Sequence, residues 1–292
     1  LISTDSQPAI SRKDVRALYE AEDGSIWVGT DSGGLDHINT DGSVSSVGAP
    51  ELTHNAILKL DGGPNSTLWV STVGGLNKLD LETGRIWSWY GNVNDPSALF
   101  DGRVFGVSPS KEESKVWVAS WGGLHQLDLT TGRFTQFRND ASDETSLSNN
   151  RSISVLEDSR GRVWVGNFIG GLNRMDPGVP GFVRFTPNPL DDTSLSGDIV
   201  ASIFEASDST IWIGTTSGLN RYEENTSSFT RYTEATGLPN NTIYGILEDD
   251  QSNLWMSTNL GLAVLNPETG VVRSFTTADG LQSNEFNQGA FH

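Results

Sequence analysis

The sequence contains no cysteine, and among its 292 residues only 19 Lys and Arg stand against 37 Asp and Glu. The missing cysteines exclude disulfide scaffolds, thiolate zinc sites, iron–sulfur clusters and cysteine nucleophiles. A formal charge of −18 argues against nucleic acids and anionic membrane surfaces as partners, because binding to them depends largely on Lys and Arg. No run approaches the roughly 18 to 20 apolar residues that a membrane-spanning helix needs.

Catalytic signatures are also missing. There is no Gly-x-Ser-x-Gly elbow, no phosphate-binding glycine loop before a lysine, no His-Glu-x-x-His and no dinucleotide fingerprint. The acidic clusters at 139–144 and 191–192 lack the spaced loop of a calcium hand, and we interpret them as solvated loops. We therefore predict no metal, no cofactor and no catalytic residue. The few histidines have different flanking residues and do not suggest a metal site: His37, His54, His125 and His292.

The sequence does contain one phrase six times: an apolar residue, Trp, an apolar residue and two small residues, followed by Gly-Leu. The tryptophans lie 42 to 48 residues apart, at Trp27, Trp69, Trp117, Trp164, Trp212 and Trp255. Each unit holds four short runs of strand-forming residues separated by Gly, Asp and Asn turns. A period of about 40 to 50 residues with four strands predicts an all-β fold, a β-propeller of four-stranded blades. The tryptophans are interpreted as wedges between blades.

The repeats also suggest where the blades begin and end. We predict one propeller domain over 1–292, of the seven-bladed type but truncated, with six full repeats and the start of a seventh. The approximate boundaries are 11–50, 51–98, 99–146, 147–194, 195–237 and 238–280, with a partial repeat at 281–292. We expect residues 281–291 to form an inner strand with few partners.

An acid recurs seven residues before the tryptophan in four repeats, at Glu20, Glu157, Glu205 and Glu248. One interpretation is a set of carboxylates for metal binding or acid–base chemistry. The other is a hydrogen-bond acceptor in the turn that joins strands one and two, and we favour this interpretation because carboxylates often bond backbone amides in turns.

The linkers between repeats share a second pattern. Asp-Glu-Thr-Ser-Leu-Ser at 143–148 returns as Asp-Asp-Thr-Ser-Leu-Ser at 191–196. Together with the Trp phrase, this pattern resembles the two-component regulator propeller repeat, which occurs in extracytoplasmic sensor regions of bacterial hybrid histidine kinases and some membrane-bound diguanylate cyclases. The resemblance implies seven-bladed rings, a periplasmic location, and contact with the membrane only through segments missing from this chain.

Two aromatic residues are out of pattern in the loop that follows the second strand. Trp121 and Phe168 stand there in neighbouring repeats, where other repeats carry mostly polar or small residues. Long loops on a rigid scaffold often carry binding residues. Exposed rings suit stacking on sugars, so we predict that both contact one ligand; the alternative is that they pack down as loop anchors.

Further candidates stand just before or within the predicted first strands, where they would line the entrance to a central channel. They are Arg16, Arg103, Arg151, Asn241 and Tyr244. The arginines could clamp a carboxylate or sulfate group, or they could balance the nearby Asp14 and Asp198.

The function that these features favour is a sensor domain without catalysis of its own. Its expected partners are a small polar ligand or oligosaccharide and, as a homodimer, a second copy of the chain. Two alternatives remain open, a propeller enzyme of the streptogramin-lyase type and a scaffold that only mediates dimerisation, because a fold does not fix a function.

Overall fold

A computed structural model describes residues 9–286, and these residues divide into two compact units, residues 9–136 and residues 137–286. Each unit is built from three antiparallel four-stranded sheets, apart from the last residue of β12. The prediction of an all-β propeller with four-stranded blades is confirmed, and the described chain forms six blades. None of its helical segments is long or apolar enough to cross a membrane.

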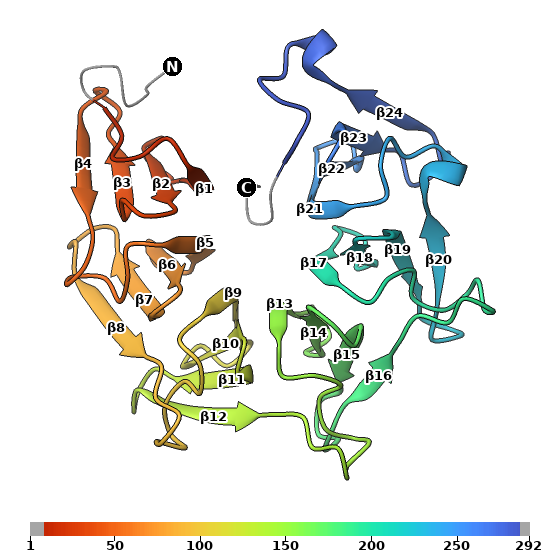
Figure 1. The fold of residues 1–292 in the computed structure, drawn as a ribbon, viewed down its shortest axis with the longest axis horizontal. Helices are drawn as coiled ribbons and strands as arrows, with labels where there is room; N and C mark the ends of the chain where they lie inside the picture. Colours follow the sequence, from red (N-terminus) through yellow and green to blue (C-terminus); the bar gives the residue numbers. More distant parts are fainter. Residues whose placement is uncertain (1–8, 287–292) are drawn as a thin grey trace. The chain divides into compact units, whose positions relative to one another are not determined.

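The first unit holds blades one to three (Figure 1). Their strands are β1 (Val15–Glu20), β2 (Ile26–Thr30), β3 (Leu35–Ile38), β4 (Val44–Val47), β5 (Ile57–Gly63), β6 (Thr67–Thr72), β7 (Gly75–Asp80), β8 (Ile86–Tyr90), β9 (Val104–Pro109), β10 (Lys115–Ser120), β11 (Gly123–Asp128) and β12 (Arg133–Phe137).

The second unit holds blades four to six. Their strands are β13 (Ser152–Glu157), β14 (Val163–Asn167), β15 (Leu172–Met175), β16 (Val183–Phe185), β17 (Val200–Glu205), β18 (Ile211–Thr215), β19 (Gly218–Glu223), β20 (Ser228–Tyr232), β21 (Ile243–Glu248), β22 (Leu254–Thr258), β23 (Gly261–Leu265) and β24 (Val272–Phe275). Two 3-10 turns, η1 (Glu234–Thr236) and η2 (Thr277–Asp279), follow β20 and β24.

In every blade the four strands pair in chain order, as a meander. The second strand is the most buried: every residue of β6, β14 and β18 is buried. This explains why the Trp phrase reads as a run of apolar and small residues instead of an alternating pattern, because neither face of the strand meets water.

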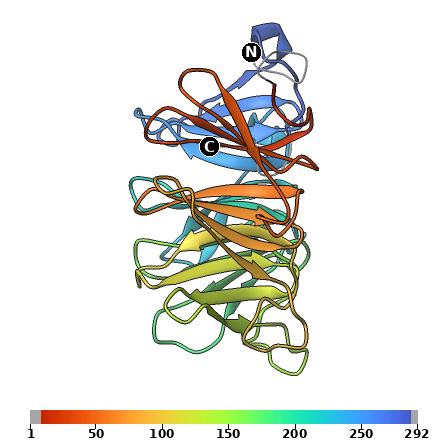
Figure 2. The same ribbon diagram turned by 90° about the vertical axis from the view of Figure 1, so that its left-hand side faces the viewer.

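Apolar side chains fill the spaces between successive blades of each unit. Trp69 packs with residues of blade three, and Trp164 and Trp212 pack in the same way with blades five and six. Their exposed fractions are 2%, 0% and 2%. The interpretation of these tryptophans as wedges is confirmed, and Figure 2 shows the sheets of the first unit, coloured red to yellow, stacked one after another.

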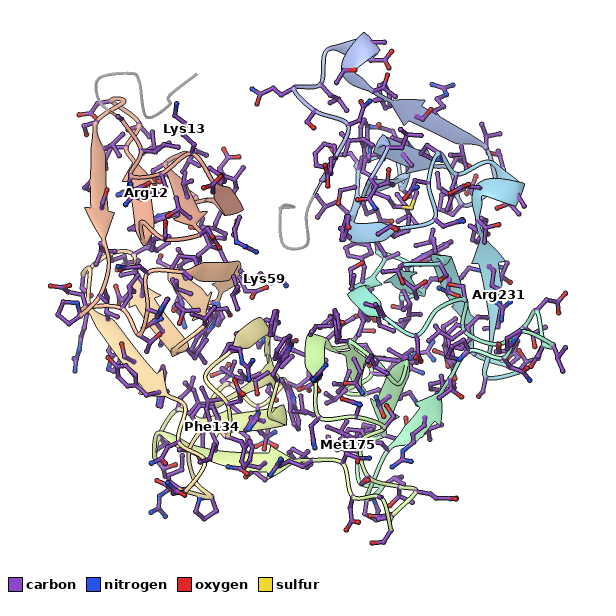
Figure 3. The ribbon with its side chains drawn as sticks, viewed as in Figure 1. Arg12, Lys13, Lys59, Phe134, Met175 and Arg231 are labelled. Atoms are coloured by element: carbon purple, nitrogen blue, oxygen red, sulfur yellow. The ribbon has the colours of Figure 1, made fainter. Side chains whose placement is uncertain are left out.

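The linkers between blades are fixed at both their apolar and their polar residues. Leu147 and Leu195 of the Ser-Leu-Ser pattern are fully buried. The backbone NH of Ser196 donates to Oδ1 of Asn220 on β19 at 2.8 Å. Arg231 on β20, labelled in Figure 3, donates from its guanidinium to the Asp191 carbonyl oxygen at 2.7 Å and to the Ser194 carbonyl oxygen at 2.7 Å.

The prediction of a truncated seventh blade is wrong for the described part of the chain. Residues 281–286 contain no strand. They lie instead against the loop between β22 and β23, where the NH of Gly261 donates to the Asn284 carbonyl oxygen at 2.6 Å. The Asn284 side chain also accepts from the NH of Thr277 in η2 at 2.7 Å. Residues 287–291 lie outside the described residues.

The interpretation of the recurrent acid also needs correction. The Glu205 carboxylate accepts from the backbone NH of Ser159 at 2.7 Å, and Glu248 accepts from the NH of Ser207 at 2.7 Å and from its hydroxyl at 2.9 Å. Both acids therefore bond the first turn of the preceding blade and not their own. Inside the turn, the acceptor is the next residue: Oδ1 of Asp158 accepts from the NH of Arg162 at 2.9 Å.

Candidate ligand-binding site

In blades one to five, the residue after the second strand is held by one recurring backbone bond. The NH of Trp121 donates to the Arg103 carbonyl oxygen at 3.2 Å, and the NH of Phe168 donates to the Arg151 carbonyl oxygen at 2.8 Å. The same bond joins Thr216 to Ile199 in blade five. The scaffold thus places an arginine beside an aromatic residue in blades three and four, by the same local geometry in each.

In blade three these side chains form a stack at the end of β10. The Arg103 guanidinium lies 4.3 Å from the centroid of the Trp121 ring. Phe105 stacks on the same indole, with centroids 5.6 Å apart and planes 21° from parallel. Trp121 and Phe105 are half-buried, while the Arg103 side chain is 45% exposed. A partly exposed stack results, in which the Trp121 indole is covered by a guanidinium and contacts a second aromatic ring.

An acid fixes the orientation of this arginine. The two guanidinium contacts to the Asp101 carboxylate are 2.9 Å from Nε and 2.5 Å from Nη2, a bidentate pair. The hydrogen bond from the Arg103 side chain lowers the pKa of Asp101 below its ordinary value and raises the pKa of Arg103. Both groups therefore stay charged near neutral pH and offer donors and acceptors to a polar ligand.

In blade four the corresponding residues are more open. Phe168 is 37% exposed and the neighbouring Ile169 46%. Arg151 is exposed, and its backbone NH donates to Oδ1 of Asn149 at 2.9 Å, as the NH of Arg103 does to Asp101. Trp121 and Phe168 belong to different compact units, so the prediction that both rings contact one ligand stays a prediction.

The other sequence candidates stand in different surroundings. Arg16 on β1 forms an ion pair with Asp31, the residue after β2, with 2.6 Å between Nε and Oδ1. Asn241 accepts from the NH of Glu234 at 2.8 Å and holds η1 against the start of blade six. Tyr244 lies half-buried on β21.

The described histidines all have structural contacts. His125 is buried and its Nε2 accepts from the NH of Phe100 at 3.2 Å, while His37 stacks on Trp27 with centroids 4.0 Å apart. Nδ1 of His54 accepts from the NH of Ala56 at 2.9 Å. Within residues 9–286, no three His, Asp or Glu side chains are grouped so that they could hold a metal ion.

Comparison with known proteins agrees with this architecture. The sequence profile of the family described as "Two component regulator propeller" matches residues 10–32, 146–168, 194–217 and 237–260. Four of the six repeats thus match the two-component regulator propeller model over part of their length. The matched segments include the start of blades one, four, five and six, and with them Arg16, Arg151, Phe168, Asn241 and Tyr244. No curated protein matches the sequence significantly.

Two similar solved structures come from B. thetaiotaomicron. The extracellular domain of a protein described as a hybrid two component system has 22% identity and a TM-score of 0.76, and the match covers 94% of this chain and 37% of that one. The extracellular domain of a one component system has 21% identity and a TM-score of 0.72, and the match covers 93% and 35%. The propeller therefore spans about a third of the length of these relatives.

A second group of similar structures is enzymatic. Virginiamycin B lyase from Staphylococcus aureus, solved with quinupristin, has a TM-score of 0.72 at 14% identity, and the match covers 98% of this chain and 89% of that one. At this level of identity the likeness concerns the propeller fold alone.

Sequence reasoning missed two parts of the arrangement in blade three. One is the stacking of Phe105, two residues after Arg103, on the Trp121 indole. Asp101, which orients Arg103, was not among the candidates. Its position two residues before an arginine at the start of the first strand is the signal that could have revealed it, because Asp and Asn commonly accept from the backbone NH two residues on.

Proposed function

We propose that this propeller is the ligand-sensing part of a bacterial membrane signalling receptor of the two-component type, that it lies in the periplasm, and that it binds a small polar ligand or oligosaccharide without catalysing a reaction. The two-component propeller repeats and the extracellular placement of the similar B. thetaiotaomicron domains support this proposal. The output module would lie in the part of the receptor that this chain does not span.

The stack of Arg103, Trp121 and Phe105 is the observation that carries the binding proposal. The exposed parts of these rings can accept the C–H groups of a sugar ring, and the Arg103–Asp101 pair, which lies over the indole, supplies charged donors and acceptors for hydroxyl or carboxylate groups. Phe168 and Arg151 are joined by the same backbone bond in blade four and are a second candidate position for a ligand.

A thermal-shift screen with neutral and acidic oligosaccharides would test binding. A ligand at 100 times its dissociation constant should stabilise the protein by about 2.7 kcal/mol. A Trp121→Ala/Phe168→Ala variant should then weaken binding tenfold or more, since stacking on each ring contributes about 1–3 kcal/mol by analogy with bases. Its melting temperature should stay near that of the wild type, because both rings are partly exposed.

Asn225→Ala, a change in an exposed turn of blade five, is a control that should leave binding unchanged. Unaltered affinity in the double variant would exclude the aromatic site. Conversion of quinupristin, followed by chromatography, would instead support an enzyme. A protein that dimerises but binds none of the screened sugars would support a scaffold.

A further inference from the structure

The grooves between blades open beside the wedge tryptophans, at the ends of the strands where the first turn lies. Between blades four and five this groove is filled by the chain's own Arg162. Its guanidinium lies 5.1 Å from the Trp164 ring centroid. Nε lies 2.6 Å from Oδ2 of Asp158, and Nη1 and Nη2 lie 2.9 and 2.7 Å from the Glu224 carboxylate. The groove thus holds a guanidinium between an indole and two carboxylates.

The Asp158 carboxylate in this groove is kept ionised. Burial alone would raise the pKa of Asp158, but hydrogen bonds from the Trp164 indole and from Arg162 lower it below its ordinary value. The Arg162 side chain is only 9% exposed. This internal contact therefore shows which chemistry the groove accommodates when it is occupied.

Between blades five and six the equivalent groove lies open as a cavity of about 350 Å³ beside Trp212. Counted from the tryptophan, Thr210 stands where Arg162 stands in blade four, and Ala206 stands where Asp158 stands. Both replacements are smaller and uncharged. The cavity therefore corresponds to the space that the arginine and its acid fill one blade earlier.

Three acids line this cavity, Asp208, Glu248 and Glu268, and Oδ1 of Asp208 accepts from the NH of Thr210 at 2.9 Å. Glu248 is engaged by Ser207, and Arg221 is paired with Glu223 at 2.9 Å. The Glu268 side chain lines the cavity, is exposed, and makes no hydrogen bond within residues 9–286. An indole and a free carboxylate thus face a space whose one lining cation, Arg221, is already paired with Glu223.

The same groove is open a second time, in the first unit. A cavity of about 220 Å³ lies beside Trp27 between blades one and two. Ala21 and Ser25 line it at the positions of Ala206 and Thr210, and Glu82 lines it at the position of Glu268. Two separate blades therefore combine the small residues, the indole and the acid, so the arrangement is not an accident of one turn.

We propose that the cavity beside Trp212 is a binding site for the guanidinium group of a ligand, which takes the place that Arg162 occupies beside Trp164, with Glu268 as its carboxylate partner. The cavity lies at the start of β18, whereas Thr216, the counterpart of Phe168, follows the other end of that strand. The site is thus separate from the proposed sugar site, and either can fail without the other.

Titration calorimetry with two guanidinium probes would test this site. Agmatine represents a free small molecule, and N-acetyl-argininamide represents an arginine side chain in a peptide. Binding of either probe supports the site, and the probe that binds identifies the source of the guanidinium group. The neutral isostere N-acetyl-citrullinamide should bind at least about tenfold more weakly, because it lacks the charge that Trp212 and Glu268 recognise. Equal binding of the neutral probe, or no binding at millimolar concentration, would overturn the proposal.

The indole NH signal of Trp212 in NMR spectra, assigned with Trp212→Phe, locates the binding and separates it from the cavity beside Trp27. An Ala206→Asp/Thr210→Arg variant supplies the cavity with its own guanidinium and should remove the probe-induced shift of this signal. Glu268→Gln, an exposed change that does not disturb packing, should weaken binding about tenfold, and Glu144→Gln on an exposed linker should not. A shift that persists in both cavity variants would contradict the assignment.

Discussion

At the scale of single residues, the propeller depends on side chains that serve two neighbours at once. Trp164 packs against Phe185 in its own blade and Tyr222 in the next, with ring centroids 6.2 and 4.9 Å apart, while its indole NH donates to Asp158 at 2.8 Å. The wedge is therefore both an apolar filling and the donor that fixes a turn.

Trp164→Ala should lower the free energy of unfolding by about 3–5 kcal/mol, since it leaves a large cavity between blades four and five. Trp87→Ala is the matched control: this half-buried residue on β8 contacts mainly Lys78 and Arg85, and its loss should cost about 1 kcal/mol or less. Urea denaturation measures both. A similar small loss for the two variants would show that Trp164 does not hold the blades together.

The second prediction at this scale concerns Asp249 and the dependence of stability on pH. Hydrogen bonds from the Trp255 indole and from Asn253 lower its pKa to about 2, against an unfolded value of about 3.9. The resulting stabilisation is complete above the unfolded pKa and is lost as the pH falls toward 2. Asp249→Asn should therefore be less stable than the wild type at pH 6, and the difference should shrink between pH 4 and pH 2.

Thermal melts across this pH range measure the effect. Trp255→Phe, which removes the indole donor, should reduce the pH dependence in the same direction. A constant gap between Asp249→Asn and the wild type from pH 6 to pH 2 would contradict the assigned pKa.

At the scale of elements, the linkers are part of the sheets that follow them. The Asn220 side chain accepts from the NH of Ser196. Its Nδ2 also donates to Oγ of Ser196 at 2.8 Å and to the Ile213 carbonyl oxygen at 3.1 Å. In blade four, the NH of Ser148 donates to Asn173 at 2.8 Å in the same way. A buried amide on the third strand thus joins the linker to the second strand.

Asn220→Ala should destabilise the protein by about 1–3 kcal/mol, because it leaves the buried NH of Ser196 and a strand carbonyl without a partner. The shift of the urea midpoint measures this loss, and Asn225→Ala in the exposed turn of the same blade is the control. Equal midpoints for the two variants would show that the linker is not fixed by this amide.

These elements also show what the sequence could and could not predict. The Trp phrase predicts the second strands well, because burial on both faces restricts the residue types directly. The predicted hydrogen-bond donor to Glu205 was wrong, because a sequence pattern shows that an acid recurs but not which blade supplies its donor. The prediction of a strand from a seventh blade was wrong because residues 276–284 repeat the turn and linker of 233–241. This pattern does not require a strand after it.

At the scale of the whole molecule, the outstanding property is charge. The net charge is −18, so the carboxylates of the folded chain repel one another on balance, and this repulsion opposes the compact state. Candidate site residues such as Arg103 and Arg151 are therefore rare cations in an acidic chain. This could be predicted from composition, whereas the stacking of Arg103 on Trp121 required coordinates.

The melting temperature should rise when sodium chloride is increased from 10 to 150 mM, since the screening length falls from about 30 to 8 Å. Sucrose of equal osmolality is the control for effects that are not ionic. A melting temperature that falls with salt would show that the attractive pairs outweigh the net repulsion.

The arginine that fills the groove beside Trp164 has a consequence for how such propellers diversify. Each groove is lined only by two adjoining blades, and two side chains, Arg162 with Asp158 or Thr210 with Ala206, distinguish a filled groove from an open one. Substitutions at two positions can thus create or erase a cavity while the remaining blades keep their packing. A gene made of tandem copies therefore carries several independent places where chemical specificity can evolve, each of them close to neutral for folding until a ligand gives it a selective value.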